Sequence, residues 1–291
     1  MARSGKTASS PGSSGNETAQ SHCRPYYDAH MDSVHREVIL DQFTRQASPF
    51  ANAPAIRNQE ALNRIVAAAG AGPEDTVLDV ACGPGLLACA FAEVARHVTG
   101  IDVTPAMLEQ ARAEQQRSGL ENVTWKLGDV PPLPFSDHSF SIVTARFALH
   151  HLLDPLAVLK EMRRVCQPGG RIAIADSAPS QAKAGAFNAM ERLRDPSHVR
   201  AMPVEELRGL LLGAGFAEPR KEFYRLEGEL EGLLERSFPK PGDADRIRRI
   251  FEDSLANDAL DMATHRQDGK TYFSFPVAIL AAENPRPSGV I

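Results

Sequence analysis

The chain has 291 residues, of which 43% are hydrophobic and 24% are charged, and its formal net charge is −5. That balance supports one sizeable α/β domain with additions, and it disfavours nucleic acid and anionic membrane surfaces as partners. No apolar run approaches the length of a membrane span, and the four cysteines (Cys23, Cys82, Cys89 and Cys166) lack metal-ligand spacing. We therefore expect a cytoplasmic enzyme without a metal ion, and we leave open whether it forms a homo-oligomer.

The first 70 residues divide into a tail and a helical segment. Residues 1–24 are rich in Ser, Gly, Thr and Ala and have no apolar block, so we expect a disordered tail rather than a secretory signal. Apolar residues recur at helical spacing in 32–45 and in 55–69, which predicts helices within the segment 25–70. The aromatic residues of this segment include Tyr27, Phe43 and Phe50.

Short apolar strands alternate with helical patterns along most of the remaining chain. This alternation predicts right-handed crossovers and a doubly wound, mostly parallel sheet that is covered by helices on both faces. The first expected strand begins at Val77 and ends at Asp79, and the others lie at 97–102, 122–127, 139–145, 171–176, 220–226 and 271–282. The segment 228–264 has helical periodicity and is expected to be a helical insertion, and 284–291 is expected to be a loose tail.

The most informative stretch runs from Val77 to Gly85, where a strand ends at an acid and breaks into a glycine turn. Open α/β sheets bind nucleotides at such junctions, because glycines let a ligand approach the backbone closely. Asp79 selects between ligands, since its charge would repel a dinucleotide pyrophosphate but attract an ammonium group. The loop therefore predicts a site for S-adenosylmethionine (SAM), although 83–88 also matches the loose dinucleotide pattern.

Two further acids follow strands at the same edge of the predicted sheet. Asp102 ends the second strand, where a carboxylate can accept hydrogen bonds from both ribose hydroxyls. Asp129 lies just past the third strand and suits the exocyclic amine of adenine. In the alternative interpretation, both acids only cap the turns that follow them.

These motifs together resemble a class I SAM-dependent methyltransferase of the group related to the ubiquinone and menaquinone methyltransferases. The resemblance covers residues 35–283 and rests also on Phe140–Val143 leading to His150-His151, and on the turn at 164–171. It implies a Rossmann-like, seven-stranded sheet whose last strand is antiparallel, in a methyltransferase domain spanning 71–283. It also implies that 25–70 forms a lid over the site; in the alternative interpretation, the aromatic residues of this segment only dock its helices to the sheet.

The resemblance further implies which residues bind SAM and its product S-adenosylhomocysteine (SAH). Asp79 and the glycines would surround the methionine moiety, Asp102 the ribose, and Asp129 with Val130 the adenine. The full expected set is Asp79, Ala81, Gly83, Gly85, Asp102, Val103, Met107, Gly128, Asp129, Val130 and Ala145.

The methyl acceptor is expected above the carboxyl ends of the fourth and fifth strands. The catalytic candidates there are His150, His151 and Arg146, and because adjacent residues on a helix point apart, at most one histidine is expected to act as a base, with His150 preferred. In the alternative interpretation, the histidines bond the backbone or shape the pocket. Arg146 could instead clamp an anionic group of the acceptor or pair with an acid of the lid. Expected substrate contacts are Tyr27, Phe43, Phe50, Phe147, Asp176, Phe187 and His198.

The helical insertion and the aromatic lid favour an enclosed site for a small apolar or aromatic acceptor, such as a natural product or a quinone. The acceptor atom (O, N, C or S) is left open. One alternative is a C-methyltransferase whose reaction is coupled to a later rearrangement. The others are a NAD-dependent oxidoreductase, which Asp79 and Asp129 disfavour, and a non-catalytic SAM-binding module.

Overall fold

The computed structural model describes residues 1–2 and 24–287, and within the first helix it describes side chains from Ser33 onward. Most of the expected tail and the Tyr27 side chain therefore lie outside the described residues. The chain divides between Glu37 and Val38 into two units, and the first contains the N-terminal half of α1 (Arg24–Ala51). This helix is longer than the expected 32–45. All other helices and strands described below belong to the second unit.

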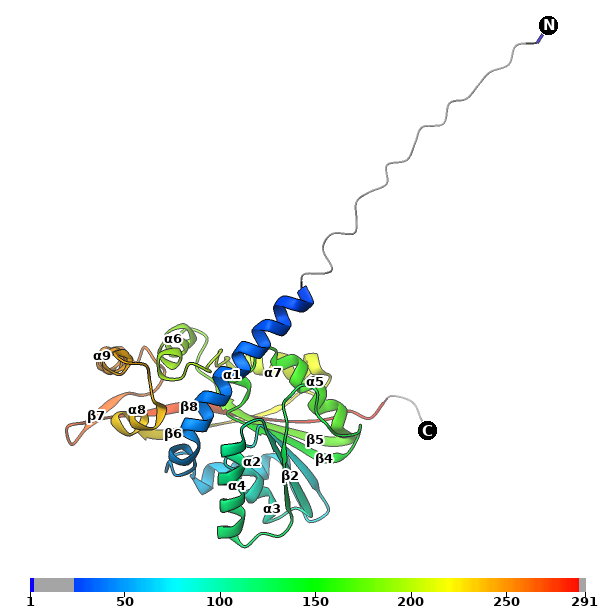
Figure 1. Cartoon of the computed structure of the whole chain (residues 1–291), viewed down its shortest axis with the longest axis horizontal. Helices are drawn as coiled ribbons and strands as arrows, with labels where there is room; N and C mark the ends of the chain where they lie inside the picture. The colour runs from blue at the N-terminus through cyan, green and yellow to red at the C-terminus, as the bar shows by residue number, and fades with distance from the viewer. Residues whose placement is uncertain (3–23, 288–291) are drawn as a thin grey trace. The chain divides into compact units, whose positions relative to one another are not determined.

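The second unit is built on one mixed sheet with the strand order β3-β2-β1-β4-β5-β8-β6 (Figure 1). Neighbours from β3 to β5 pair in parallel, and β8 is antiparallel to both β5 and β6, which confirms the expected architecture. The short strand β7 pairs with the start of β8 and adds an eighth strand. The bounds are β1 Thr76–Val80, β2 His97–Asp102, β3 Val123–Leu127, β4 Phe140–Arg146, β5 Cys166–Ser177, β6 Arg220–Glu229, β7 His265–Gln267 and β8 Lys270–Glu283.

The strand order reverses direction between β1 and β4, which lie side by side at the centre. Both strands are buried on both faces, as shown by Val77 and Leu78 of β1 and by Ile142 and Val143 of β4, which are each 0% exposed. Central parallel strands read as continuous apolar runs for this reason. The carboxyl ends of β1 and β4 form the topological switch point, where open α/β sheets place their ligands.

Helices cover both faces of the sheet. One apolar cluster joins α2 (Gln59–Ala69) and α3 (Leu86–Ala92) to one face, and a second joins α5 (Pro155–Val165) and α7 (Val204–Ala214) to the other. α4 (Pro105–Ser118) packs against α3 and β3. α2 and α5 begin at side-chain caps, with Asn58 Oδ1 accepting from Ala61 N and Asp154 Oδ1 from Ala157 N. Such caps satisfy backbone N–H groups that the helix itself leaves unpaired.

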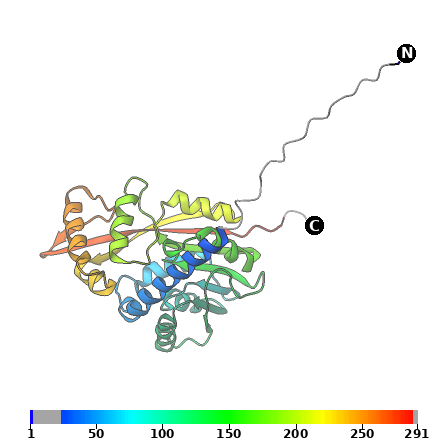
Figure 2. The same cartoon turned by 45° about the horizontal axis from the view of Figure 1, so that its top comes forward.

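A third apolar cluster joins α6 (Ala184–Arg194), α8 (Leu230–Ser237) and α9 (Asp243–Asn257) to the far part of β8. In Figure 2 the orange helices of this group lie beside the red strand β8. Phe251 of α9 and Phe273 of β8 pack with ring centroids 5.3 Å apart. α8 and α9 occupy the segment in which the sequence predicts a helical insertion.

The prediction that 284–291 forms a loose tail is wrong at its first residue, Asn284. Asn284 is 3% exposed, and its Nδ2 donates to the carbonyl of Cys166 at 2.9 Å. Its backbone N–H donates to Gly170 O at 2.8 Å, so the end of β8 is tied to the turn inside β5. A short polar residue after a strand gave no sequence signal for this long-range contact.

Among the residues that the structure describes, no helix combines the length and apolarity needed to cross a bilayer.

Candidate active site

The loop after β1 has the geometry of a ligand cradle. Gly83 and Gly85 adopt positive φ values of 53° and 75°, a conformation that is strained for other residues. A Cβ added to Gly83 would meet nothing within 4 Å, so the loop surface is open there. A Cβ on Gly85 would lie 2.5 Å from the Trp125 ring, so packing also requires glycine at that position.

Asp102, at the end of β2, holds this loop in place. Its Oδ2 accepts a hydrogen bond from Gly83 N at 2.8 Å, and its Oδ1 accepts one from Thr104 N at 2.8 Å. Asp129 is exposed, and its Oδ1 accepts from Val130 N at 2.8 Å. Both acids therefore accept hydrogen bonds from backbone N–H groups of the turns that follow them.

The remaining expected cofactor residues lie at the same edge of the sheet. Gly128 N donates to Asp102 O at 3.0 Å, which joins the ends of β2 and β3. Val103 follows β2 directly, Met107 is a buried residue in the first turn of α4, and Ala145 is buried near the end of β4. Ala81 has a φ of 53° at the point where the chain leaves β1.

Asp79 is 1% exposed, and its Oδ2 has no hydrogen-bond partner. Burial raises the pKa of Asp79 to about 8, against the effect of the nearby Arg146 guanidinium, which lowers it. Asp102 raises it further. In the part of the chain that the structure describes, no ion pair joins Asp79 to a basic side chain.

Arg146 is the last residue of β4, and only part of its guanidinium group has a hydrogen-bond partner. Nη1 donates to Ile56 O at 3.0 Å, and the guanidinium carbon lies 4.7 Å from the centroid of the Phe147 ring. Nε and Nη2 are buried without a partner, as is the hydroxyl of Tyr224 on β6. Burial lowers the pKa of Arg146, while the neighbouring Tyr224 and Asp79 act to raise it. Among the side chains that the structure describes, Arg146 forms no ion pair with an acid of the expected lid, which was one of the alternatives for this residue.

Three buried histidines gather beyond the ends of β4 and β5. His150 and His151 lie in the short 3-10 helix η1 (Leu149–His151), and His198 lies between α6 and α7. The ring centroid of His150 lies 4.2 Å from that of His151 and 5.3 Å from that of His198. The expectation that the adjacent histidines point apart is wrong, because η1 is a tight turn that keeps both rings in one cluster.

His150 is held by Asp176, at the end of β5. His150 Nδ1 bonds to Asp176 Oδ1, and Asp176 Oδ2 accepts from Leu149 N at 2.8 Å. Burial lowers the pKa of His150, but the charge and hydrogen bond of Asp176 outweigh it and leave this pKa raised. Asp176 Oδ1 also accepts from Ser177 N at 2.7 Å. Asp176 was expected to contact substrate; it instead positions His150.

His151 is oriented by the segment between α6 and α7. Its Nδ1 lies 3.1 Å from both the carbonyl and the hydroxyl oxygen of Ser197, and Ser197 Oγ donates to Asp195 Oδ1 at 2.5 Å. Burial, together with the neighbouring His150, lowers the pKa of His151 to about 4. The Phe43 ring of α1 packs edge-on against His151, with centroids 5.0 Å apart.

The protonation of His198 is fixed by its partner Asn188. Asn188 Nδ2 donates to two backbone carbonyls, and its Oδ1 accepts from Ala201 N at 2.7 Å, so the amide orientation is determined. Because Oδ1 can only accept, His198 Nε2 must carry the hydrogen in their 2.7 Å contact. His198 Nδ1 is then a bare acceptor, and it is buried without a partner. Burial strongly lowers the pKa of His198, so the ring stays neutral.

Other expected substrate residues have different surroundings. Phe187 is 0% exposed and packs in the cluster of α6, α8 and α9, so its expected substrate role is replaced by a packing role. Phe147 packs beside Arg146, and Phe50 is partly buried near the end of α1. Sequence reasoning missed Tyr224 and Asn188, because no local motif marks them.

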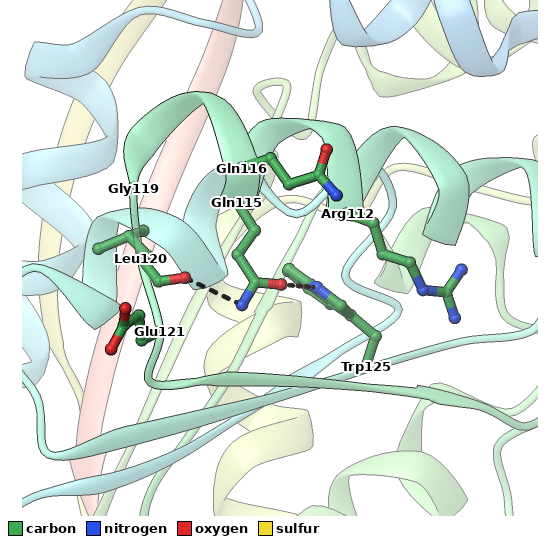
Figure 3. A pocket seen from close by; sticks show the side chains of 7 residues that line it. All are labelled: Arg112, Gln115, Gln116, Gly119, Leu120, Glu121 and Trp125. Atoms are coloured by element: carbon green, nitrogen blue, oxygen red, sulfur yellow. Dashed lines mark hydrogen bonds between the residues drawn. The ribbon is translucent and has the colours of Figure 1, made fainter.

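A separate hollow of about 470 Å³ lies at the C-terminal end of α4, lined by polar residues and by Trp125 (Figure 3). Gln115 fills part of it, receiving a hydrogen bond from Trp125 Nε1 at 2.7 Å and donating to Leu120 O at 3.1 Å. The hollow contains none of the residues expected to bind cofactor or acceptor. Across the described residues, no group of three or more His, Cys, Asp or Glu is arranged to hold a metal ion.

A doubly wound sheet with an acid and an open glycine turn at its switch point defines a protein that binds a nucleoside cofactor there. The family model described as "Methyltransferase domain" matches residues 78–174. An uncharacterised methyltransferase, YcgJ of Bacillus subtilis (strain 168), is 35% identical over 211 residues, covering 72% of this chain and 82% of the relative. The chain therefore belongs to the class I SAM-dependent methyltransferases.

Two further similarities agree with the assignment to this methyltransferase family. The crystal structure of the Bacillus YcgJ protein superposes with a TM-score of 0.71 at 27% identity, covering 79% of this chain and 99% of that one. Demethylmenaquinone methyltransferase of Staphylococcus aureus (strain JH9) is 32% identical over 194 residues, covering 66% of this chain and 71% of the relative. The cofactor is SAM, and the unpartnered Asp79 Oδ2 and the open face of Gly83 fit its ammonium-bearing end.

Proposed function

We propose that the protein transfers the methyl group of SAM to a small apolar or aromatic acceptor bound against the histidine cluster His150, His151 and His198. The observation that carries the proposal is the buried, unpartnered Nδ1 of His198. A buried acceptor without a donor is costly, so a ligand that brings an O–H or N–H to it would remove that cost. The Phe43 ring on His151 adds an apolar, aromatic wall.

SAM supplies an electrophilic methyl group, and the side chains described here orient and deprotonate the acceptor. His150 Nδ1 donates to the Asp176 carboxylate in the neutral ring, which leaves Nε2 as the nitrogen that takes a proton. His198 Nδ1 accepts a hydrogen bond from the same acceptor and stays neutral. The cluster thus provides one base and one orienting group for a phenol, an enol or an amine.

The C-terminal half of α1, with α2, is proposed as the lid of this site. Gln42 and Gln46 are both buried, and their amide groups donate to the Ser237 carbonyl of α8 at 2.7 and 3.2 Å. Arg57 pairs with Glu114 of α4 at 2.8 Å, which fixes the connection after α1. These contacts hold Phe43 over the cluster and would exclude water during transfer.

A quinone-like acceptor is the leading candidate. The support is the name of the Staphylococcus aureus relative, a demethylmenaquinone methyltransferase, together with the aromatic and neutral lining described above. The test is methyl transfer from labelled SAM to a panel of hydroquinones, simple phenols and small amines. We expect labelled product from hydroxylated aromatics. Transfer only to polar amines, or none to any compound while SAM binds, would contradict the proposal.

His198→Ala probes the acceptor side directly. It should raise the KM for a hydroxylated aromatic by about 10-fold or more, since one hydrogen bond to a buried group is lost. The affinity for SAH, measured by calorimetry, should stay within about 3-fold. A matched control is His265→Ala, because His265 is exposed on β7. Equal losses of SAH affinity and acceptor affinity would indicate a general structural defect instead.

A further inference from the structure

A buried ion cluster lies at the end of α6, and none of its members serves as the proposed base or orienting group. It consists of Arg194, Glu191 and Asp195, whose side chains are 13%, 4% and 2% exposed. Arg194 Nη2 and Nε donate to the two carboxylate oxygens of Glu191 at 2.6 and 2.9 Å, and Nη1 lies 3.9 Å from Asp195 Oδ2. Burial acts to lower the pKa of Arg194, but both carboxylates outweigh it and leave this pKa raised. Buried ion pairs add little net stability, because desolvation offsets their attraction, and their better-attested effect is to fix one arrangement of the surrounding groups.

Asp195 fixes the turn that holds two of the three histidines. Its Oδ1 accepts hydrogen bonds from Ser197 N at 2.9 Å and from Ser197 Oγ at 2.5 Å, and its backbone carbonyl accepts from His198 N at 3.0 Å. Because Ser197 gives its hydroxyl hydrogen to Asp195, both Ser197 oxygens can only accept from His151 Nδ1. The neutral His151 ring therefore carries its hydrogen on Nδ1, and the turn 195–198 sets this tautomer together with the position of His198.

Arg194 also reaches the residue of α8 that anchors the part of the proposed lid on α1. Its Nη1 donates to Ser237 Oγ at 3.2 Å. The backbone carbonyl of the same Ser237 accepts the amide groups of Gln42 and Gln46. Ser237 is buried, and its hydroxyl donates to Leu233 O at 2.7 Å, which leaves a lone pair of that hydroxyl for Arg194. The guanidinium and the lid are thereby joined through one buried serine.

The lid meets the histidines at a second point. Phe43 is next to Gln42 on α1, and its ring packs on that of His151 with centroids 5.0 Å apart. The lid thus contacts the histidine cluster directly through Phe43 and indirectly through Ser237 and Arg194. The direct contact is apolar and tolerates small displacements, whereas the indirect connection consists of directional hydrogen bonds. The indirect connection therefore specifies the orientation of the histidines more tightly.

We propose that Arg194 is a positioning residue that couples the closed lid to the histidine cluster. It binds the lid anchor Ser237 and the turn 195–198 at the same time. His151 and His198 therefore take the orientation used in the reaction only while the lid is held at α8. This role rests on the proposed function of the histidines, whereas the connection between lid and turn exists without any methyl acceptor.

Backbone hydrogen exchange of the full chain without ligands, followed by NMR, tests the connection. Gln42→Met combined with Gln46→Met removes both amide donors that hold the lid to α8. We expect the amides of 42–50 to exchange faster because the lid is released, and those of Ser197 and His198 to exchange about 3- to 10-fold faster as well. Both of these amides bond within the turn and not to the lid. Unchanged exchange at Ser197 and His198, or a lid that stays protected, would overturn the proposal.

The same double substitution in a Ser237→Ala background shows which route carries the effect. Ser237→Ala deletes the hydroxyl that receives Arg194 and keeps the backbone carbonyl that holds the lid. With this link removed, releasing the lid should change exchange in the turn 195–198 by less than about 2-fold. An undiminished effect would show that the coupling runs through Phe43 and the His151 ring, and would overturn the role of Arg194.

Arginine variants check that the guanidinium is the bridge. Arg194→Met combined with Glu191→Gln removes the guanidinium, keeps the net charge of the ion cluster and leaves no unpaired carboxylate at position 191. It should remove the coupling as Ser237→Ala does, and coupling that persists in this variant would contradict the proposal. Arg192→Met is the matched control and should keep the coupling, because Arg192 is an exposed arginine of the same helix that donates to Val199 O at 3.4 Å. If the double variant at α6 does not fold, Ser237→Ala decides.

Kinetics separate the positioning role from the proposed function. Ser237→Ala should raise the KM for a hydroxylated aromatic about 3- to 10-fold, with kcat and the calorimetric affinity for SAH each within about 3-fold. An unchanged KM in this variant would overturn the positioning role, even if lid and turn exchange together. If the wild-type protein methylates no such compound, the proposed function fails, and the exchange measurement still decides whether Arg194 connects the lid to the turn.

Discussion

Asp102 Oδ2 accepts a hydrogen bond from Gly83 N, so the acid at the end of β2 holds the glycine loop that follows β1. Its other oxygen accepts from Thr104 N, where α4 begins. One buried carboxylate therefore fixes two of the backbone segments that surround the cofactor. This relationship gives Asp102 a structural role that exists before any ribose is bound.

Asp102→Ala should lower both stability and cofactor affinity. Two buried N–H groups lose their acceptor, which should reduce the free energy of unfolding by about 1–3 kcal/mol. SAH affinity should fall about 10-fold or more, because the loop is no longer held. Urea unfolding and calorimetry measure the two effects. Asp154→Ala is the control, since it removes a helix cap at α5 and should cost about 1 kcal/mol without changing SAH affinity.

Asp79 should make the ligand-free protein less stable as pH rises. Its pKa is raised from 3.8 to about 8, so between these values the folded protein keeps a proton that the unfolded chain releases. Unfolding then releases a proton, and the free energy of unfolding falls with increasing pH until about pH 8. Asp79→Asn should flatten this slope and be more stable than the wild type at pH 8. Urea unfolding from pH 5 to pH 9 measures both, and identical slopes would contradict the prediction.

The raised pKa of Asp79 also predicts that a proton is released when the cofactor binds. The α-ammonium of SAH favours the ionised carboxylate, so binding below pH 8 should expel up to one proton from Asp79. SAH affinity should therefore rise with pH from 6 to 8. Calorimetry in buffers of different ionisation enthalpy counts the protons. The Asp79→Asn variant should release no proton on binding SAH. A wild-type protein that also releases no proton would contradict the prediction.

The sole tryptophan should report cofactor binding. Trp125 is the single Trp of the chain, and its ring fills the space beside Gly85 and Gly100. A ligand seated on the glycine loop would change the environment of this ring, so its fluorescence should shift on titration with SAH. Trp125→Phe should abolish the signal and keep binding detectable by calorimetry. Saturation by calorimetry with unchanged wild-type fluorescence would contradict this placement.

How much the sequence could predict depends on whether the determinants are local. Asp79 and Asp102 lie at or next to the ends of β1 and β2, and Asp129 lies two residues past β3, so each acid can be recognised in the sequence by its position after a short apolar run. The alternation of strands and helices likewise follows from short-range periodicity and gives the mostly parallel sheet. These patterns fix backbone conformation over a few residues, which is the range in which sequence reasoning is strongest.

The unpredicted part of the site depends on long-range placement. Tyr224 and Arg146 affect each other's pKa although β5 and β8 lie between their strands, and no motif near residue 224 records that order. His198 reaches the cluster because the His150 carbonyl accepts from Val199 N and Arg200 N at 2.9 and 3.0 Å. Phe187 was misjudged for the same reason, since its partners come from α9 and β8.

The His150–Asp176 pair should control turnover and its pH dependence. His150→Gln should reduce turnover about 100-fold or more if His150 is the base, with SAH affinity within about 3-fold. Because Asp176 raises the pKa of His150, the rate should increase with pH through a value above the ordinary 6.5 for histidine. Asp176→Asn removes that charge, so the inflection should move to lower pH. The profile of turnover from pH 5 to pH 9, measured with a hydroxylated aromatic acceptor, checks both shifts. An inflection that stays in place in Asp176→Asn would show that the titrating group is not His150.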